Sequence, residues 1–124
     1  MVVNIGSFSV HVWSSDHFGA DREKGVTEGR EAFGFTLNVD KRRLVYTGDV
    51  ASTYCFLDQL KSGTTLLCEA MHVEWQKIAQ IDDEYKFRQV VLTHPSPDMV
   101  DRLKLFCQNH ENISLAEDGM EFNW

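Results

Sequence analysis

Three residues with metal-binding side chains each follow a segment that we expect to be a β-strand. They are His17, Asp49 and His94, which are far apart in the sequence. If these strands lie in one sheet, their carboxyl-terminal ends meet at one edge and bring the three side chains together. Two imidazoles and one carboxylate are suitable ligands for zinc, manganese or iron(II). The sequence therefore predicts a metal site at this edge.

Each of these residues also has a simpler interpretation. A single histidine after a strand is more often a surface or hydrogen-bonded residue than a ligand. Asp49 alone would more often accept backbone N–H bonds in a turn or at a helix start. Glu69 and His72 follow another apolar segment near the same edge. We interpret Glu69 as a structural acid rather than a catalytic one.

The strands that would position these residues are short apolar segments. Residues 2–13 alternate well enough to form one strand, or two strands separated by Gly6. Residues 32–39 and 43–48 flank the tight turn DKR and are predicted to pair as an antiparallel hairpin. Residues 89–94 are apolar enough to be buried on both faces of a parallel sheet. The other predicted strands are 65–70 and a closing pair, 113–116 and 120–122.

Helices are predicted between the later strands, at residues 53–61, 72–81 and 97–110. Gly63 is placed to cap the first helix, and residues 82–86 interrupt the pattern of the second. Ser96 as N-cap with Pro97 at the first helical position begins the third. This order of elements predicts a layered α/β fold.

Residues 14–31 are rich in glycine and charge and have no apolar period, which predicts a long functional loop. The remaining bulk properties are ordinary. The 124 residues suit one domain, 1–124, and the net charge of −7 argues against general attraction to nucleic acid. Three widely spaced cysteines without a CxxC pair favour reduced thiols and a cytoplasmic location. No segment is apolar and long enough to span a membrane, and no secretory signal is visible at the N-terminus.

The sequence motifs around the candidate ligands resemble those of a known family. A histidine is followed by AFGF, VYTGD, LLCEA, VVLTH and AEDGM in this order. This succession is similar to the C-terminal half of metallo-β-lactamase-fold hydrolases, most of all the ribonuclease Z-like and related phosphodiesterase branches. The resemblance implies an α/β fold that is half of the metallo-β-lactamase αβ/βα sandwich, a mixed β-sheet covered by helices.

The resemblance also implies roles for the candidate ligands. In that family two metal ions are held by an N-terminal HxHxDH motif, a later histidine, a bridging aspartate and a final histidine. By this match His17 resembles the later histidine, Asp49 in TGD the bridging aspartate and His94 in LTH the final histidine. The implied cofactor is a divalent metal, zinc first and manganese or iron as alternatives, with two ions in the intact site. Asp49 and His94 would then be the catalytic residues.

The sequence departs from the family in two ways. Residues 18–31 intervene between His17 and AFGF, where the family has only a few residues, and no HxHxDH motif is present. We therefore expect the missing N-terminal half or a partner subunit to complete the protein, or a homodimer to form through an exposed sheet face.

The expected function is that of part of a metal-dependent hydrolase. We expect phosphodiester cleavage in the intact protein, little or no activity in this chain alone, and nucleic acid only as a substrate. The alternative is a non-catalytic half-fold domain that serves subunit association.

Overall fold

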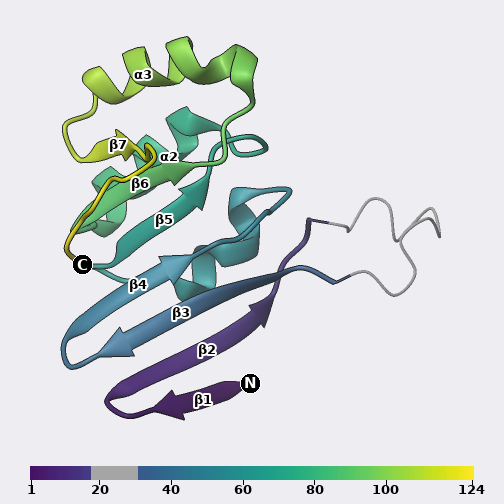
Figure 1. The fold of residues 1–124 in the computed structure, drawn as a ribbon, viewed down its shortest axis with the longest axis vertical. Helices are drawn as coiled ribbons and strands as arrows, with labels where there is room; N and C mark the ends of the chain where they lie inside the picture. Colours follow the sequence, from purple (N-terminus) through teal and green to yellow (C-terminus); the bar gives the residue numbers. More distant parts are fainter. Residues whose placement is uncertain (18–30) are drawn as a thin grey trace.

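A mixed β-sheet dominates the computed structural model, which describes residues 1–17 and 31–124. The described residues form a seven-stranded sheet whose spatial order follows the sequence, β1 to β7 (Figure 1). The strands are β1 (Val2–Ile5), β2 (Phe8–Ser14), β3 (Phe33–Val39), β4 (Arg42–Tyr46), β5 (Thr65–Glu69), β6 (Gln89–Thr93) and β7 (Ile113–Leu115). Strands β1 to β4 pair antiparallel, and β4 to β7 pair parallel. The predicted mixed sheet is confirmed.

Two tight turns produce the antiparallel part of the sheet. Residues 2–13 form two strands rather than one, because the chain reverses direction at Gly6. Gly6 has a φ of 59°, a left-handed conformation that glycine adopts without steric strain. The predicted hairpin between β3 and β4 is present, with Asp40 in the left-handed region of its turn. The predicted loop at 14–31 begins one residue later, since Ser14 ends β2, and its residues 18–30 lie outside the described residues.

The connections between the parallel strands are helical, with corrections to the predicted bounds. The first connection is a 3₁₀ helix, η1 (Thr53–Gln59), and it ends because Leu60 is extended; Gly63 therefore lies beyond its cap. The second is α2 (Trp75–Tyr85), so the predicted interruption at residues 82–86 is wrong. The helix continues because Ile78, Ile81 and Tyr85 keep its apolar stripe facing the core.

The third connection begins as predicted. Ser96 is the N-cap of a short 3₁₀ turn, η2 (Pro97–Met99), which leads into α3 (Val100–Gln108). Helix α3 packs beside β7 through the core residue Leu103. No helix in the described part of the chain is long and apolar enough to cross a membrane.

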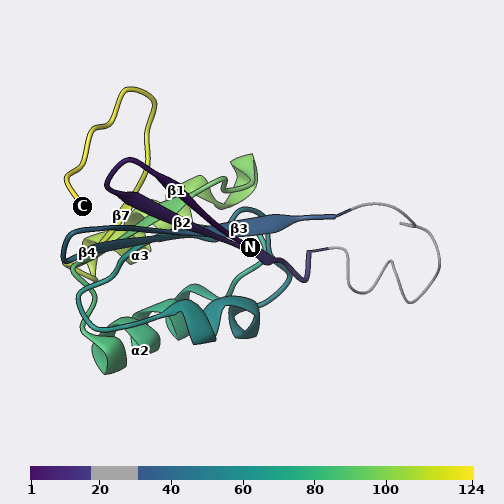
Figure 2. The same ribbon diagram turned by 90° about the horizontal axis from the view of Figure 1, so that it is seen from below.

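One face of the sheet is covered and forms the core. Helix α2 and η1 lie under this face (Figure 2). Its inward side chains alternate along the strands, as the period of two requires. The fully buried members on the strands are Val45, Leu66, Cys68, Val90 and Leu92.

The opposite face is apolar as well, but it is only partly covered. The strand register aligns Val10 with Leu37 and Val12 with Phe35 on this face. Phe35 in turn lies opposite Tyr46, and their rings stack with centroids 6.4 Å apart. We call this surface the open face. Its apolar side chains on β1 to β4 are Val3, Ile5, Phe8, Val10, Val12, Phe33, Phe35, Leu37, Val39, Leu44 and Tyr46.

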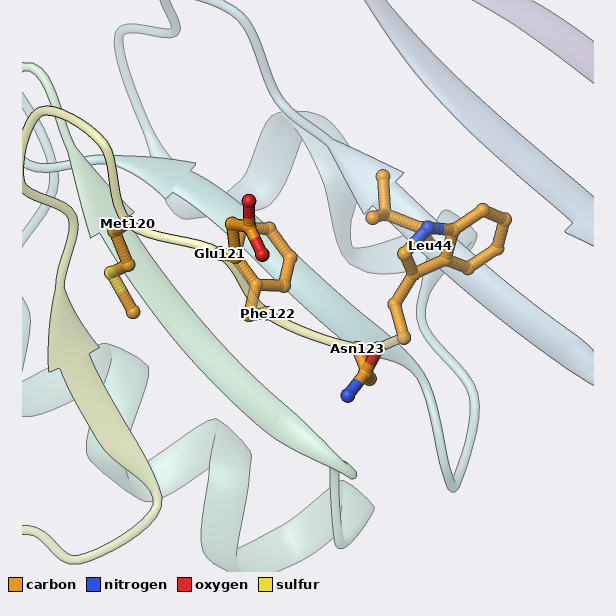
Figure 3. A pocket seen from close by; sticks show the side chains of 6 residues that line it. Leu44, Met120, Glu121, Phe122 and Asn123 are labelled. Atoms are coloured by element: carbon orange, nitrogen blue, oxygen red, sulfur yellow. The ribbon is translucent and has the colours of Figure 1, made fainter.

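The C-terminal segment crosses the open face at β4 to β6. The predicted strand at 120–122 is absent, because these residues run as irregular chain over the sheet instead of pairing with it (Figure 2). Arg42 donates to the carbonyl of Trp124 at 3.1 Å, and Gln89 donates to that of Asn123. A cavity of about 640 Å³ lies between Leu44 and residues 120–124 (Figure 3). Since Arg42 and Gln89 begin their strands, the segment ends at the edge opposite Asp49.

Candidate metal centre

Asp49 stands just beyond the carboxyl-terminal end of β4, where β5 and β6 also end (Figure 1). The turn before it depends on Gly48, whose φ is 56°. A Cβ atom on Gly48 would lie 2.5 Å from the carbonyl oxygen of Phe33, so only glycine fits there. The close approach of these two backbones fixes where the Asp49 carboxylate leaves the sheet.

His94 comes from β6 and meets Asp49. Its Nε2 lies 3.8 Å from Asp49 Oδ1, and both side chains are about half exposed, at 53% and 48%. His94 has a φ of 54°, which is uncommon for a residue with a side chain. Strained residues of this kind concentrate at functional sites. The predicted meeting of Asp49 and His94 at one sheet edge is therefore present in the fold.

His17 contacts Ser15 and His72. Its backbone N–H donates to Ser15 Oγ at 3.2 Å, and its ring packs edge to face against His72 with centroids 5.2 Å apart. No group of three histidine, cysteine or acidic side chains in residues 1–17 and 31–124 is arranged to hold a metal ion. The described chain thus brings together two of the three expected ligands.

The donor chemistry of Asp49 and His94 fits a divalent cation in part. A carboxylate oxygen and an imidazole nitrogen are ordinary zinc ligands, but a zinc site normally has four positions. The described arrangement supplies two of them, and both side chains are about half exposed to solvent. The pair is half of a coordination shell that needs further ligands.

Glu69 ties two loops of this edge together. Its carboxylate is buried, with 1% of the side chain exposed, and accepts the N–H groups of Val50 at 3.2 Å and His72 at 2.8 Å. Its Oε1 also lies 2.8 Å from His72 Nδ1. A buried carboxylate needs such partners, since burying it without them would be costly. These bonds agree with the interpretation of Glu69 as a structural acid.

The sequence reasoning missed Ser15 and Asp16, which anchor the loop that carries Asp49. Ser15 Oγ donates to the Asp49 carbonyl at 2.6 Å. Asp16 accepts the N–H of Ala51 at 2.8 Å and the hydroxyl of Ser52 at 2.7 Å. Burial raises the pKa of the Asp16 carboxyl, but the hydrogen bonds from Ser52 and Ala51 outweigh it and lower the pKa below its ordinary value. The rule that selected His17, a polar residue after a strand, would also have found Asp16.

The cysteines near the site are thiols. Cys55, Cys68 and Cys107 are all free cysteines. The Sγ atom of Cys55 accepts the N–H of Asp16 at 3.2 Å. Cys68 is fully buried in β5. Burial raises the pKa of each of the three thiols, so none is activated as a nucleophile.

Comparisons with known proteins identify the fold. No family model matches the sequence, and no curated protein matches it either. Among solved structures, the metallo-β-lactamase fold protein YhfI from Bacillus subtilis superposes with a TM-score of 0.71 at 16% sequence identity. The chain has a metallo-β-lactamase-like fold. The superposition covers 97% of this chain and 50% of YhfI, so the chain spans half the length of that protein.

The metallo-β-lactamase-like fold explains the position of Asp49 and His94 without assigning them an activity. At 16% identity the likeness concerns the fold alone. It confirms the expected α/β class and the general resemblance, whereas the ribonuclease Z-like branch stays a prediction.

Proposed function

We propose that this chain provides one sheet and part of the metal shell of a metal-dependent hydrolase of the metallo-β-lactamase superfamily. The observation that carries the proposal is the 3.8 Å approach of Asp49 Oδ1 to His94 Nε2 at the edge where three parallel strands end. Ligands collect at such edges in α/β folds. Two metal-binding groups from different strands meet there. The backbone of His94 has a positive φ at this point, a conformation that costs a residue other than glycine some strain.

The proposed roles follow from the donor atoms. Asp49 and His94 would hold a divalent cation, zinc first and manganese or iron(II) as alternatives, and His17 is the proposed third ligand from this chain. Such a cation lowers the pKa of a bound water and polarises a phosphoryl oxygen. The chain's other residues position the ligands: Ser15 holds the Asp49 carbonyl, and Glu69 holds the next residue, Val50.

The proposed reaction is phosphodiester cleavage, ahead of amide or thioester cleavage, and nucleic acid enters only as a substrate. A complete site with two ions needs the ligands of an HxHxDH half, which this chain lacks. We propose that a second half or subunit packs on the open face and brings those ligands. This chain alone is then weakly active or inactive.

The open face favours one alternative function. A contiguous apolar surface with exposed large side chains across β1 to β4 is typical of a protein interface, whether or not Asp49 binds a metal. A half-fold domain that serves only subunit association would keep this surface and would need no metal.

Zinc binding separates the two functions. In calorimetric titrations we expect the purified chain to bind zinc, and we expect Asp49→Asn and His94→Ala each to weaken binding by more than about tenfold. His110→Ala is the matched control, because His110 stacks on Phe106 at the end of α3, with ring centroids 4.1 Å apart. A chain that does not bind zinc, or binds it equally well in all three variants, would contradict the metal proposal and favour association.

A further inference from the structure

A small cavity lies between η1 and α2, where the segments that follow β4 and β5 meet. Its volume is about 90 Å³, and its lining comes from residues 51–54, residues 72–74 and Lys77. The first segment begins two residues after Asp49, and the second begins three residues after Glu69. Because a water molecule takes up about 30 Å³ in the liquid, the cavity has room for a group the size of a small oxyanion.

One wall of the cavity carries a fixed positive charge. Lys77 Nζ donates to Tyr54 Oη at 2.7 Å and lies 4.0 Å from the centroid of the Tyr54 ring. No carboxylate in the described part of the chain forms an ion pair with Lys77. In a chain of net charge −7 this ammonium group is held over an aromatic ring instead of being neutralised by an acid.

The start of α2 adds to this electrostatic environment. The helix has 11 residues and begins at Trp75, and its N-cap residue Glu74 makes no side-chain capping bond. The first N–H groups of a helix and its dipole favour an anion at this end. Glu74 also lines the cavity, and its negative charge disfavours binding of an anion there. Removing that charge is therefore expected to strengthen anion binding.

We propose that this cavity is an anion subsite that holds a phosphate group of the substrate beside the metal centre. Lys77 Nζ and Tyr54 Oη are its donors, and His72 lies on its wall. The assignment rests on the proposed function, because it places a second phosphate of the substrate near the group that is cleaved. The preferred substrate then carries a phosphate group next to its scissile bond.

Phosphate binding can be tested without metal. The probe is inorganic phosphate, titrated into the ¹⁵N-labelled chain in the presence of EDTA and followed by amide chemical shifts. We expect saturable shifts at residues 51–54 and 72–77. We expect Lys77→Met to raise the Kd for phosphate about tenfold, the loss of one charge-assisted hydrogen bond, and Glu74→Gln to lower it. Lys104→Met, on α3, is the matched control and should leave the Kd unchanged.

Three results would overturn the inference: no saturable shifts at these residues, equal phosphate binding by Lys77→Met and wild type, or equally tight binding of acetate. If Lys77→Met does not fold, Tyr54→Phe removes one donor and keeps the ring, and it should bind phosphate several-fold more weakly. Zinc titration of the same variants, in samples without EDTA or phosphate, is an independent measurement. If the chain binds zinc but no phosphate at the cavity, only the proposed anion subsite is contradicted. If it binds phosphate but no zinc, only the proposed metal site is contradicted.

Discussion

The carboxylate of Glu69 accepts the backbone N–H of Val50 at 3.2 Å, which joins the end of β5 to the residue after Asp49. The same carboxylate holds His72 through its backbone N–H and its Nδ1. A single buried side chain thus sets the relative position of the loops that follow β4 and β5.

Replacing Glu69 by glutamine should destabilise the fold. The amide has no negative charge and one fewer acceptor oxygen for these three partners, so we expect the free energy of unfolding to fall by about 1–3 kcal/mol. Urea denaturation at pH 7 measures it. Glu74→Gln is the control, because Glu74 is exposed and its replacement should change the free energy of unfolding by no more than about 0.5 kcal/mol. Equal effects of the two variants would show that Glu69 has no special structural role.

Gly48→Ala should lower stability and disturb the candidate metal centre. Its Cβ atom would meet the Phe33 carbonyl at 2.5 Å, and φ at this position is positive. Gly63→Ala is the matched control, because Gly63 also has a positive φ but no atom within 4 Å of the added Cβ. The control should lose about 1–2 kcal/mol from backbone strain, and Gly48→Ala at least about 1 kcal/mol more from the clash. Only Gly48→Ala should weaken zinc binding, since only that change displaces Asp49.

Asp16 should make stability depend on pH. Its folded-state pKa is lower than its ordinary value, so its stabilising contribution is present above the unfolded-state pKa of about 3.9 and is lost as pH falls through the folded-state pKa. Asp16→Asn should therefore be less stable than wild type at pH 7, and the difference should shrink below about pH 4. Urea denaturation from pH 3 to pH 7 measures this. Asp58→Asn, at an exposed position of η1, is the control. A difference that stays constant with pH would contradict the assignment.

The sequence predicts those parts of the fold that depend on local pattern. The uninterrupted apolar run of β6 indicated a strand buried within a parallel sheet, and Asp49 and His94 could be placed at one edge because parallel strands end together. The strand expected at 120–122 does not form, since pairing depends on a neighbouring strand that a local pattern cannot reveal. The role of Asp16 was hidden for a similar reason, because its partners Ala51 and Ser52 are 35 and 36 residues away.

The open face should associate with a second copy when no other partner is present. Phe8 is 41% exposed on this face, next to Ile5 and Val39 in the strand register. We expect the wild-type chain to sediment as a dimer, and Phe8→Lys to shift it toward a monomer that binds a hydrophobic dye, because a lysine there is desolvated on association. Leu105→Lys is the matched control, since Leu105 is 60% exposed on α3, away from the open face. A wild-type chain that is monomeric at every concentration and binds no dye would refute this association.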